Sequence, residues 1–100
     1  MSYVRVSLMV PLQKEQELEE ALKQVELVGM AVVHCRGYGS HPNFYFANWT
    51  MECAMFEIFL VQEHMEQLKQ KIKSVCPPGS DSEGIAIVSD VREIQRVSDI

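Results

Sequence analysis

Two histidines and two cysteines are the side chains of this sequence best suited to metal chemistry. They are His34, Cys35, His41 and Cys53. Imidazole and thiolate ligands together suit zinc or copper. Adjacent residues of a strand point to opposite faces, so His34 and Cys35 are not expected to bind one ion together. His41 and Cys53 are the predicted metal pair, because they bracket a segment that could fold back as a hairpin. Two ligands are too few for a site, so neighbouring subunits would have to supply more.

A second interpretation of these residues needs no metal. Free cysteine is often a small buried apolar residue, and a histidine in a connection is often simply polar and exposed. Under this interpretation Cys35 and Cys53 lie in the interior and His41 lies in a loop. This second interpretation is favoured over metal binding.

Four aromatic residues follow within six positions of one another. They are Phe44, Tyr45, Phe46 and Trp49. Aromatic side chains are frequent anchors of protein interfaces, which favours a partner-binding loop. They are equally typical of strands that pack across a hairpin or against another subunit. Packing within the protein's own assembly is favoured, and binding of a partner by part of the set stays open.

A few glycines and arginines could hold an anion. Gly37 and Gly39 can bring backbone N–H groups close to a ligand. Arg36 and Arg96 are the basic residues predicted to contact an anionic ligand in a cleft between subunits. The segment 79–84, GSDSEG, carries two carboxylates that would repel a phosphate, so a solvated turn is favoured there.

Several classes of function are not expected. The sequence has no HExxH, P-loop or GxGxxG motif, so no enzyme activity is predicted. A net charge of −5 argues against binding to nucleic acid. The three cysteines are far apart with no CxxC, which favours reduced thiols in a cytoplasm. The chain shows neither a secretory leader pattern nor an apolar run of the roughly 20 residues that insertion into a membrane requires.

The spacing of apolar residues predicts the elements that carry these residues. Strands are expected at 3–10, 30–36, 44–61 and 85–88, and amphipathic helices at 13–25 and 62–75. The strand at 44–61 is expected to be long or broken. The order β-α-β-β-α-β predicts a ferredoxin-like α+β fold in a single domain of residues 1–100. In this fold two helices cover one face of a four-stranded antiparallel sheet.

The second face of that sheet has no helix left to cover it. Several strands nevertheless carry apolar residues toward both faces, as Val32 and Val33 do in one strand and Phe56 and Phe59 in another. An uncovered apolar face usually marks a surface of association. The pattern therefore predicts an oligomer.

Two segments resemble the PII signal-transduction proteins. Residues 20–39, EALKQVELVGMAVVHCRGYG, are similar to that family's helix end, Val-x-Gly-Met, strand and Gly-Phe-Gly. Residues 83–99, EGIAIVSDVREIQRVSD, are similar to its last strand and the acidic-apolar stretch that follows. The resemblance implies a cytoplasmic homotrimer that senses a small molecule between subunits and controls a membrane transporter or a metabolic enzyme. The effector would be an adenine nucleotide (ATP, ADP or AMP) or a small anion such as bicarbonate.

The resemblance also implies roles for single residues. The family's T-loop corresponds to a shorter loop at 40–52, and His41 takes the place of a glutamine that helps hold metal and 2-oxoglutarate. A 2-oxoglutarate-pairing lysine falls near Cys53, the nucleotide loop is reduced to SDSEG ending at Gly84, and of a closing arginine pair only Arg96 remains. Most phosphate donors are therefore lost, and a divergent member is expected. The predicted effector-binding residues are Arg36, Gly37, Gly39, His41, Gly84 and Arg96.

Two other hypotheses stay open. A metal-tolerance trimer similar to the CutA family would use His41 and Cys53, and the segment 43–49, NFYFANW, loosely resembles that family's Tyr/Trp-containing hairpin. In a purely structural trimer, the loop 40–52 would serve only assembly.

Overall fold

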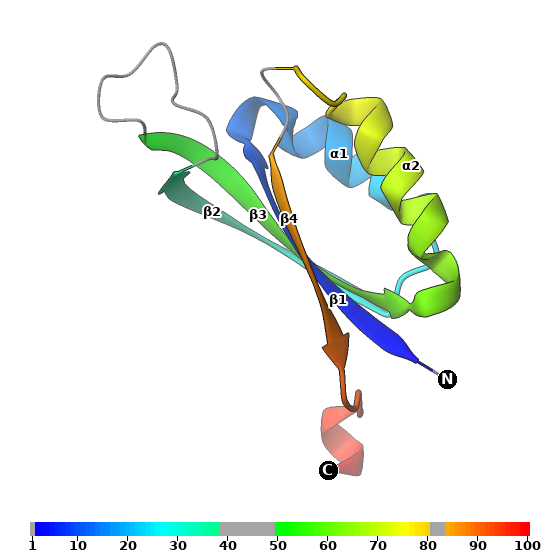
Figure 1. Cartoon of the computed structure of the whole chain (residues 1–100). Helices are drawn as coiled ribbons and strands as arrows, with labels where there is room; N and C mark the ends of the chain where they lie inside the picture. Colours follow the sequence, from blue (N-terminus) through cyan, green and yellow to red (C-terminus); the bar gives the residue numbers. More distant parts are fainter. Residues whose placement is uncertain (1, 39–49, 81–83) are drawn as a thin grey trace.

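A computed structural model describes residues 2–38, 50–80 and 84–100 of the chain. Its strands are β1 (Tyr3–Pro11), β2 (Gly29–Tyr38), β3 (Thr50–Val61) and β4 (Ile85–Val91), and its helices are α1 (Glu15–Leu22) and α2 (Met65–Val75). Short 3-10 turns lie at η1 (Leu12–Lys14), η2 (Gln62–His64) and η3 (Val97–Asp99). Both helices pack against the same face of the sheet (Figure 1). The predicted order of elements is confirmed.

All four strands join one antiparallel sheet in the order β2-β3-β1-β4. This is the ferredoxin-like arrangement predicted from the sequence. The strand β1 lies inside the sheet, with Tyr3 opposite both Val61 of β3 and Val91 of β4. The edges of the sheet are therefore β2 and β4.

The register defines two ends of the sheet. We call the end where β2 stops and β3 starts the hairpin end. Pro11 pairs with Cys53 and Met9 with Ile85, so the last residues of β1 and the first of β4 lie there too. Gly29, which begins β2, lies at the opposite end.

The covered face, which the helices pack against, carries the hydrophobic core. Each of its central side chains is at most 5 % exposed: Val4, Val6, Leu8 and Val10 of β1, Ala54, Phe56, Ile58 and Leu60 of β3, Leu18 and Leu22 of α1, and Met65, Leu68 and Val75 of α2. The strict alternation in β1 and the three- to four-residue spacing in the helices produce this face. Burial of each large apolar side chain stabilises the fold by about 1.5–3 kcal/mol.

Some predicted boundaries were wrong by a few residues. The helix expected at 13–25 starts at Glu15 after a 3-10 turn and ends at Leu22. Val25 is buried all the same, because a turn in which its N–H donates to the Leu22 carbonyl continues the helical spacing. Likewise β4 continues to Val91 rather than residue 88, because its pairing with β1 continues that far.

The strand expected at 44–61 is confirmed from Thr50 onward. Its residues 44–49 lie outside the described part of the chain.

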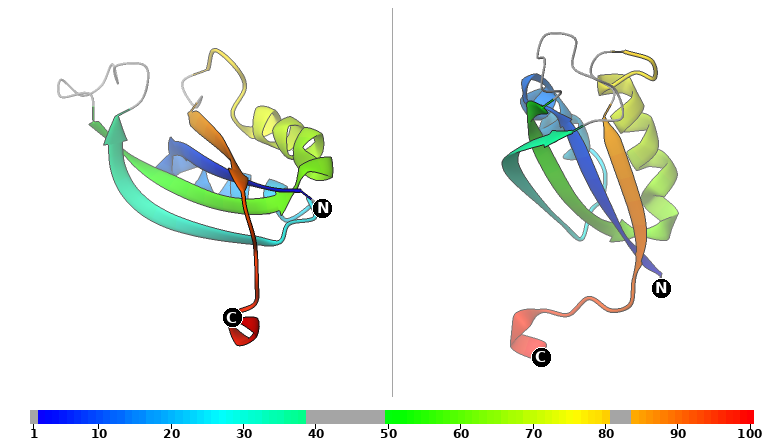
Figure 2. Two further views of the ribbon diagram at one scale, coloured as in Figure 1. Left: turned by 60° about the horizontal axis from the view of Figure 1, so that its bottom comes forward. Right: turned by 60° about the vertical axis from the view of Figure 1, so that its left-hand side comes forward.

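The other face of the sheet, which we call the open face, has no helix against it (Figure 2). Apart from Cys53, which is fully buried, its apolar side chains are only partly buried, as for Met9, Met55 and Phe59, or exposed, as for Val33 at 54 % and Ile87 at 62 %. The predicted uncovered apolar face is therefore present in the subunit.

Candidate functional site

Two of the predicted effector-binding residues lie at the hairpin end of β2. Arg36 is exposed and its Cα lies opposite that of Glu52, and Gly37 lies opposite Met51. Arg36 shares a face of the strand with His34. The positive charge of Arg36 therefore has an acidic residue directly across the ladder, which weakens its field at any anion bound nearby.

His34 contacts the helix layer rather than a metal site. Its Nε2 hydrogen-bonds with the carboxylate of Glu15 at the start of α1, with Nε2 and Oε2 2.9 Å apart. Both side chains are accessible to solvent, His34 at 66 % and Glu15 at 24 %. The pair joins the edge strand β2 to α1 at the surface.

Gly84 lies at the same end of the sheet, just before β4, and its lack of a side chain has a packing reason. A Cβ placed there would lie 1.9 Å from the carbonyl oxygen of Met9 and 2.9 Å from its carbonyl carbon. These are backbone atoms of β1, so they cannot swing away. The close approach of β4 to β1 thus requires glycine at this position, whatever else the residue does.

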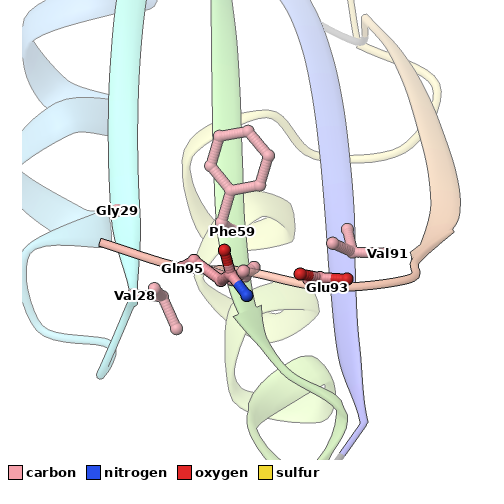
Figure 3. Close-up of a pocket in the computed structure, with 7 residues that line it drawn as sticks. Val28, Gly29, Phe59, Val91, Glu93 and Gln95 are labelled. Atoms are coloured by element: carbon pink, nitrogen blue, oxygen red, sulfur yellow. The ribbon is translucent and has the colours of Figure 1, made fainter. Parts of the chain in front are cut away.

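The chain after β4 turns back across the open face at the opposite end of the sheet (Figure 3). It borders an open hollow of ≈ 290 Å³ lined by Val28, Gly29, Phe59, Val91 and residues 93–95. The lining from the strands is apolar, and the crossing segment adds the carboxylate of Glu93. This hollow suits an apolar group better than an anion.

Arg96 directly follows this crossing segment, so it lies near the beginning of β2. Gly29 and Arg36 are seven residues apart in an extended strand, a separation of about 23 Å. Within one subunit the structure therefore brings Arg36, Gly37 and Gly84 to one end and leaves Arg96 at the other.

Cys35 and Cys53 lie directly opposite each other on β2 and β3. Their Sγ atoms are 2.9 Å apart, and the Cys53 thiol is also 3.3 Å from the Cys35 carbonyl oxygen. Cys53 is fully buried, as predicted, whereas Cys35 is only partly buried. Burial, followed by the hydrogen bond to Cys35, raises the pKa of the Cys53 thiol to about 12. A thiolate ligand is therefore disfavoured at this position.

Within residues 2–38, 50–80 and 84–100, no group of three or more His, Cys, Asp or Glu side chains could hold a metal ion. His41 is outside these ranges, so the His41–Cys53 metal pair stays a prediction. The other predicted site residues outside the described part of the chain are Gly39, Phe44, Tyr45, Phe46 and Trp49.

A polar cluster on the open face was not predicted. Arg5 Nε donates to Glu57 Oε2 at 2.7 Å, and Ser7 Oγ donates to Glu57 Oε1 at 2.8 Å. The hydrogen bond from Arg5 is the main cause that lowers the pKa of Glu57. The signal in the sequence was Glu57, the acidic residue inside the otherwise apolar run 53–61. A fixed charge pair on an apolar surface favours one docking geometry over others.

A sequence model of the family described as "Nitrogen regulatory protein P-II" matches residues 4–99. The chain belongs to this P-II family. This match confirms the resemblance to the PII proteins that the sequence indicated. P-II proteins are signal-transduction regulators rather than enzymes.

A curated relative supports the assignment to the P-II family. The nitrogen regulatory protein P-II of Rhizobium meliloti (strain 1021) is 29 % identical to this chain over 91 residues. The match covers 84 % of this chain and 81 % of the relative.

Solved structures share the P-II fold with this chain. An Arabidopsis thaliana PII bound to citrate superposes with a TM-score of 0.76 at 21 % identity, covering 97 % of this chain and 84 % of that one. A DUF3240 family protein from Shewanella baltica OS155 gives 0.78 at 13 % identity, with 97 % and 98 % covered. A GlnK–ATP complex from B. subtilis gives 0.70 at 17 % identity, with 90 % and 82 % covered. At these identities the likeness establishes the fold alone.

None of the helices in the described part of this P-II family member combines the length and the hydrophobicity that crossing a bilayer requires.

Proposed function

We propose that this P-II family member is a cytoplasmic homotrimeric regulator built from one domain of residues 1–100. A small effector binds in the clefts between subunits and changes the segment 40–52, whose last three residues belong to β3. This segment then binds or releases a membrane transporter or a metabolic enzyme. The protein performs no catalysis, binds no nucleic acid and does not insert into a membrane. Effector control of the loop requires that the effector bind one loop state more tightly than the other.

The open face is the observation that carries this proposal. Val33 and Ile87 on this face are more than half exposed, and Phe59, Met9 and Met55 between them are only partly buried. An apolar sheet face of this kind is stabilised when another subunit removes it from water. Assembly as a trimer would bury it.

The positions of the two arginines support a site shared between subunits. Arg36 and Arg96 lie at opposite ends of the sheet, about 23 Å apart along β2. One subunit therefore cannot place both on one small anion. In an assembly, Arg96 of one subunit can lie beside Arg36 of the next.

The charges near these residues favour a weakly held effector. Glu52 lies across the ladder from Arg36, and the segment before Gly84 is acidic in sequence. An adenine nucleotide would have to be bound with few phosphate donors, so a small anion such as bicarbonate is an equal candidate.

Sedimentation velocity tests the assembly. We expect a species of three times the 11.4 kDa protomer mass at micromolar concentration. Val33→Glu, which places a charge on the open face, should dissociate it. Gln67→Glu adds the same charge to an exposed position of α2 and should leave it intact. A monomeric wild type would refute the proposal.

Calorimetric titration with ATP, ADP, AMP, cyclic AMP and bicarbonate tests the effector. Arg36→Gln and Arg96→Gln should each lower the affinity for the bound ligand at least tenfold. Lys73→Gln removes an equal charge from the exposed last turn of α2 and should not. If none of the five compounds binds, the proposed effector classes are wrong.

Mixed trimers decide whether the two arginines act across subunits. A trimer that contains both single variants has one cleft in which Arg36 and Arg96 are both intact. Mixing the two inactive variants should therefore restore binding to part of the clefts. No restoration in trimers proved to be mixed would show that the arginines do not share an intersubunit site.

A further inference from the structure

The cysteine pair of β2 and β3 carries an inference that does not depend on the effector site. Cys35 and Cys53 are partners in the β2–β3 ladder, and strand alternation places both on the open face beside Val33 and Met55. Their sulfur atoms are 2.9 Å apart with no other cysteine near them in sequence.

The backbone geometry at this position permits a covalent bond. Directly opposed residues of an antiparallel pair have Cα atoms about 4.5–5.5 Å apart. Disulfides span Cα separations of about 4.4–6.8 Å. The two sulfurs need to approach by only about 0.9 Å to reach the S–S bond length of about 2.0 Å. The bond can therefore form without movement of the strands.

The same geometry disfavours a shared metal ion. Two thiolates on a tetrahedral zinc ion with Zn–S bonds of about 2.3 Å lie about 3.8 Å apart, which exceeds the observed 2.9 Å. Burial also raises the pKa of the Cys53 thiol to about 12, so a second thiolate would be costly to form. Disulfide formation requires only one exposed thiolate at the start.

We propose that Cys35 and Cys53 form a reversible intramolecular disulfide when the protein meets a hydroperoxide. Cys35 lies on the edge strand β2 and is the more exposed of the two in the subunit, so it is the first to react. Its thiolate attacks a peroxide oxygen, the O–O bond breaks and hydroxide leaves, which converts Cys35 to a sulfenic acid. The Cys53 sulfur then attacks the Cys35 sulfur, the S–O bond breaks, and the Cys53 proton leaves with the hydroxide as water. Two thiols lose two electrons, and hydrogen peroxide becomes two waters.

The cross-link would act on the hairpin end of the sheet. Beyond the cysteines the described ladder has three more pairs, which end with Tyr38 opposite Thr50. In the reduced protein the backbone ladder holds these edge residues together. A disulfide fixes the register of β2 against β3 immediately before the chain leaves the ladder. A dithiol reductant reverses it by thiol–disulfide exchange.

Peptide mapping tests the proposal directly, because trypsin separates the three cysteines. Cys35, Cys53 and Cys76 fall in the tryptic peptides 24–36, 37–69 and 74–92. After treatment with hydrogen peroxide and alkylation, a non-reducing digest should contain the first two peptides joined, lighter than their sum by two hydrogen atoms. Dithiothreitol should separate them. Peptide 74–92 should remain alkylated, and a Cys76→Ser variant should give the same product.

A mixture of isotope-labelled and unlabelled protein shows whether the bond forms within one chain. Joined peptides of uniform label support the proposal, and mixed-label pairs as the main product overturn it. A product joined to peptide 74–92, or Cys35 oxidised to sulfinic acid while Cys53 remains alkylatable, also overturns it. These outcomes are read on the wild-type chain, so they hold even if Cys35→Ser or Cys53→Ser fails to fold. The oxidised protein should melt about 10 °C higher than the reduced one.

Discussion

The covered face and the open face are made by alternate residues of the same four strands, yet they are completed in different ways. On β3, Phe56 is 0 % exposed beneath the helices, while Phe59 three residues later is only partly buried on the other side. The covered face is a finished core inside one subunit. The open face is left partly exposed in the single subunit, and a covering surface would stabilise it further.

The two faces of the sheet also differ in their polar side chains. Among the described residues, the core contains no buried polar or charged side chain. The open face holds the Arg5–Ser7–Glu57 cluster and the cysteine pair. The covered face sets the stability of the subunit, whereas the proposed assembly and regulation would act on the open face and the hairpin end.

The largest expected effect is the contrast between two phenylalanines. Phe56→Ala should lower the free energy of unfolding by about 3–5 kcal/mol, because it leaves a cavity in a closed core. Phe59→Ala should lower it by about 1–2 kcal/mol in a dissociated subunit, because its side chain is only partly buried there. Urea denaturation at two protein concentrations measures both.

The same two variants also test whether the two faces differ in their dependence on assembly. Phe59→Ala should make the unfolding midpoint less dependent on protein concentration, since it weakens assembly, and Phe56→Ala should leave that dependence as in the wild type. Equal losses of unfolding free energy from the two substitutions, with no difference in concentration dependence, would contradict the contrast between a fully buried face and a partly exposed one.

A second substitution tests how closely β4 approaches β1 at Gly84. Gly84→Ala should lower the free energy of unfolding by about 1–3 kcal/mol, because the added Cβ meets the backbone of Met9. Gly29→Ala is the control, because a Cβ at Gly29 meets nothing within 4 Å. Thermal unfolding measures both variants, and a loss for Gly84→Ala no larger than that for Gly29→Ala would show that β4 does not approach β1 this closely.

A third prediction concerns the charge on the open face. The pKa of Glu57 is lowered from 4.5 by Arg5, so its contribution to stability is present above pH 4.5 and is lost as the pH falls below that value. Glu57→Gln should therefore destabilise the protein at pH 7 more than at pH 3. Unfolding curves at both pH values measure the difference. Glu66→Gln, on the exposed side of α2, should change stability by about 0.5 kcal/mol or less.

The smallest effect is expected at the rim of the covered face. His34→Ala removes the contact with Glu15, but both groups are accessible to solvent. The free energy of unfolding should change by about 0.5 kcal/mol or less at pH 7. A loss above about 1.5 kcal/mol in chemical denaturation would show that this pair holds α1 against β2 more firmly than an exposed contact can.

The sequence predicted the order of elements because hydrophobic periodicity records which side of each element is buried. The alternation of β1 and the spacing around Leu18 and Leu68 identify the covered face correctly. The ends of elements were less predictable, as Val25 shows, because a turn can continue the spacing of a helix without belonging to it.

The arrangement of the candidate site could not be predicted in the same way. Periodicity indicates the face of a residue but not its register against another strand, so the pairing of Cys35 with Cys53 was not foreseen. The path of the chain after β4, which brings residues 93–95 to the hollow beside Val28 and Phe59, follows from no local pattern in the sequence. For that reason the sequence could not show that Arg96 lies far from Arg36 within a subunit.

The central place of β1 has a consequence for how the chain is made. This strand is synthesised before both of its neighbours, β3 and β4. Tyr3 can pair on one side only after Val61 has been made, and on the other only after Val91 has been made. Until then its two sides can pair with any other exposed strand edge, including one from a second nascent chain. Folding of this subunit is therefore completed late in synthesis, and chains shortened before Val91 are expected to aggregate rather than to form a smaller stable domain.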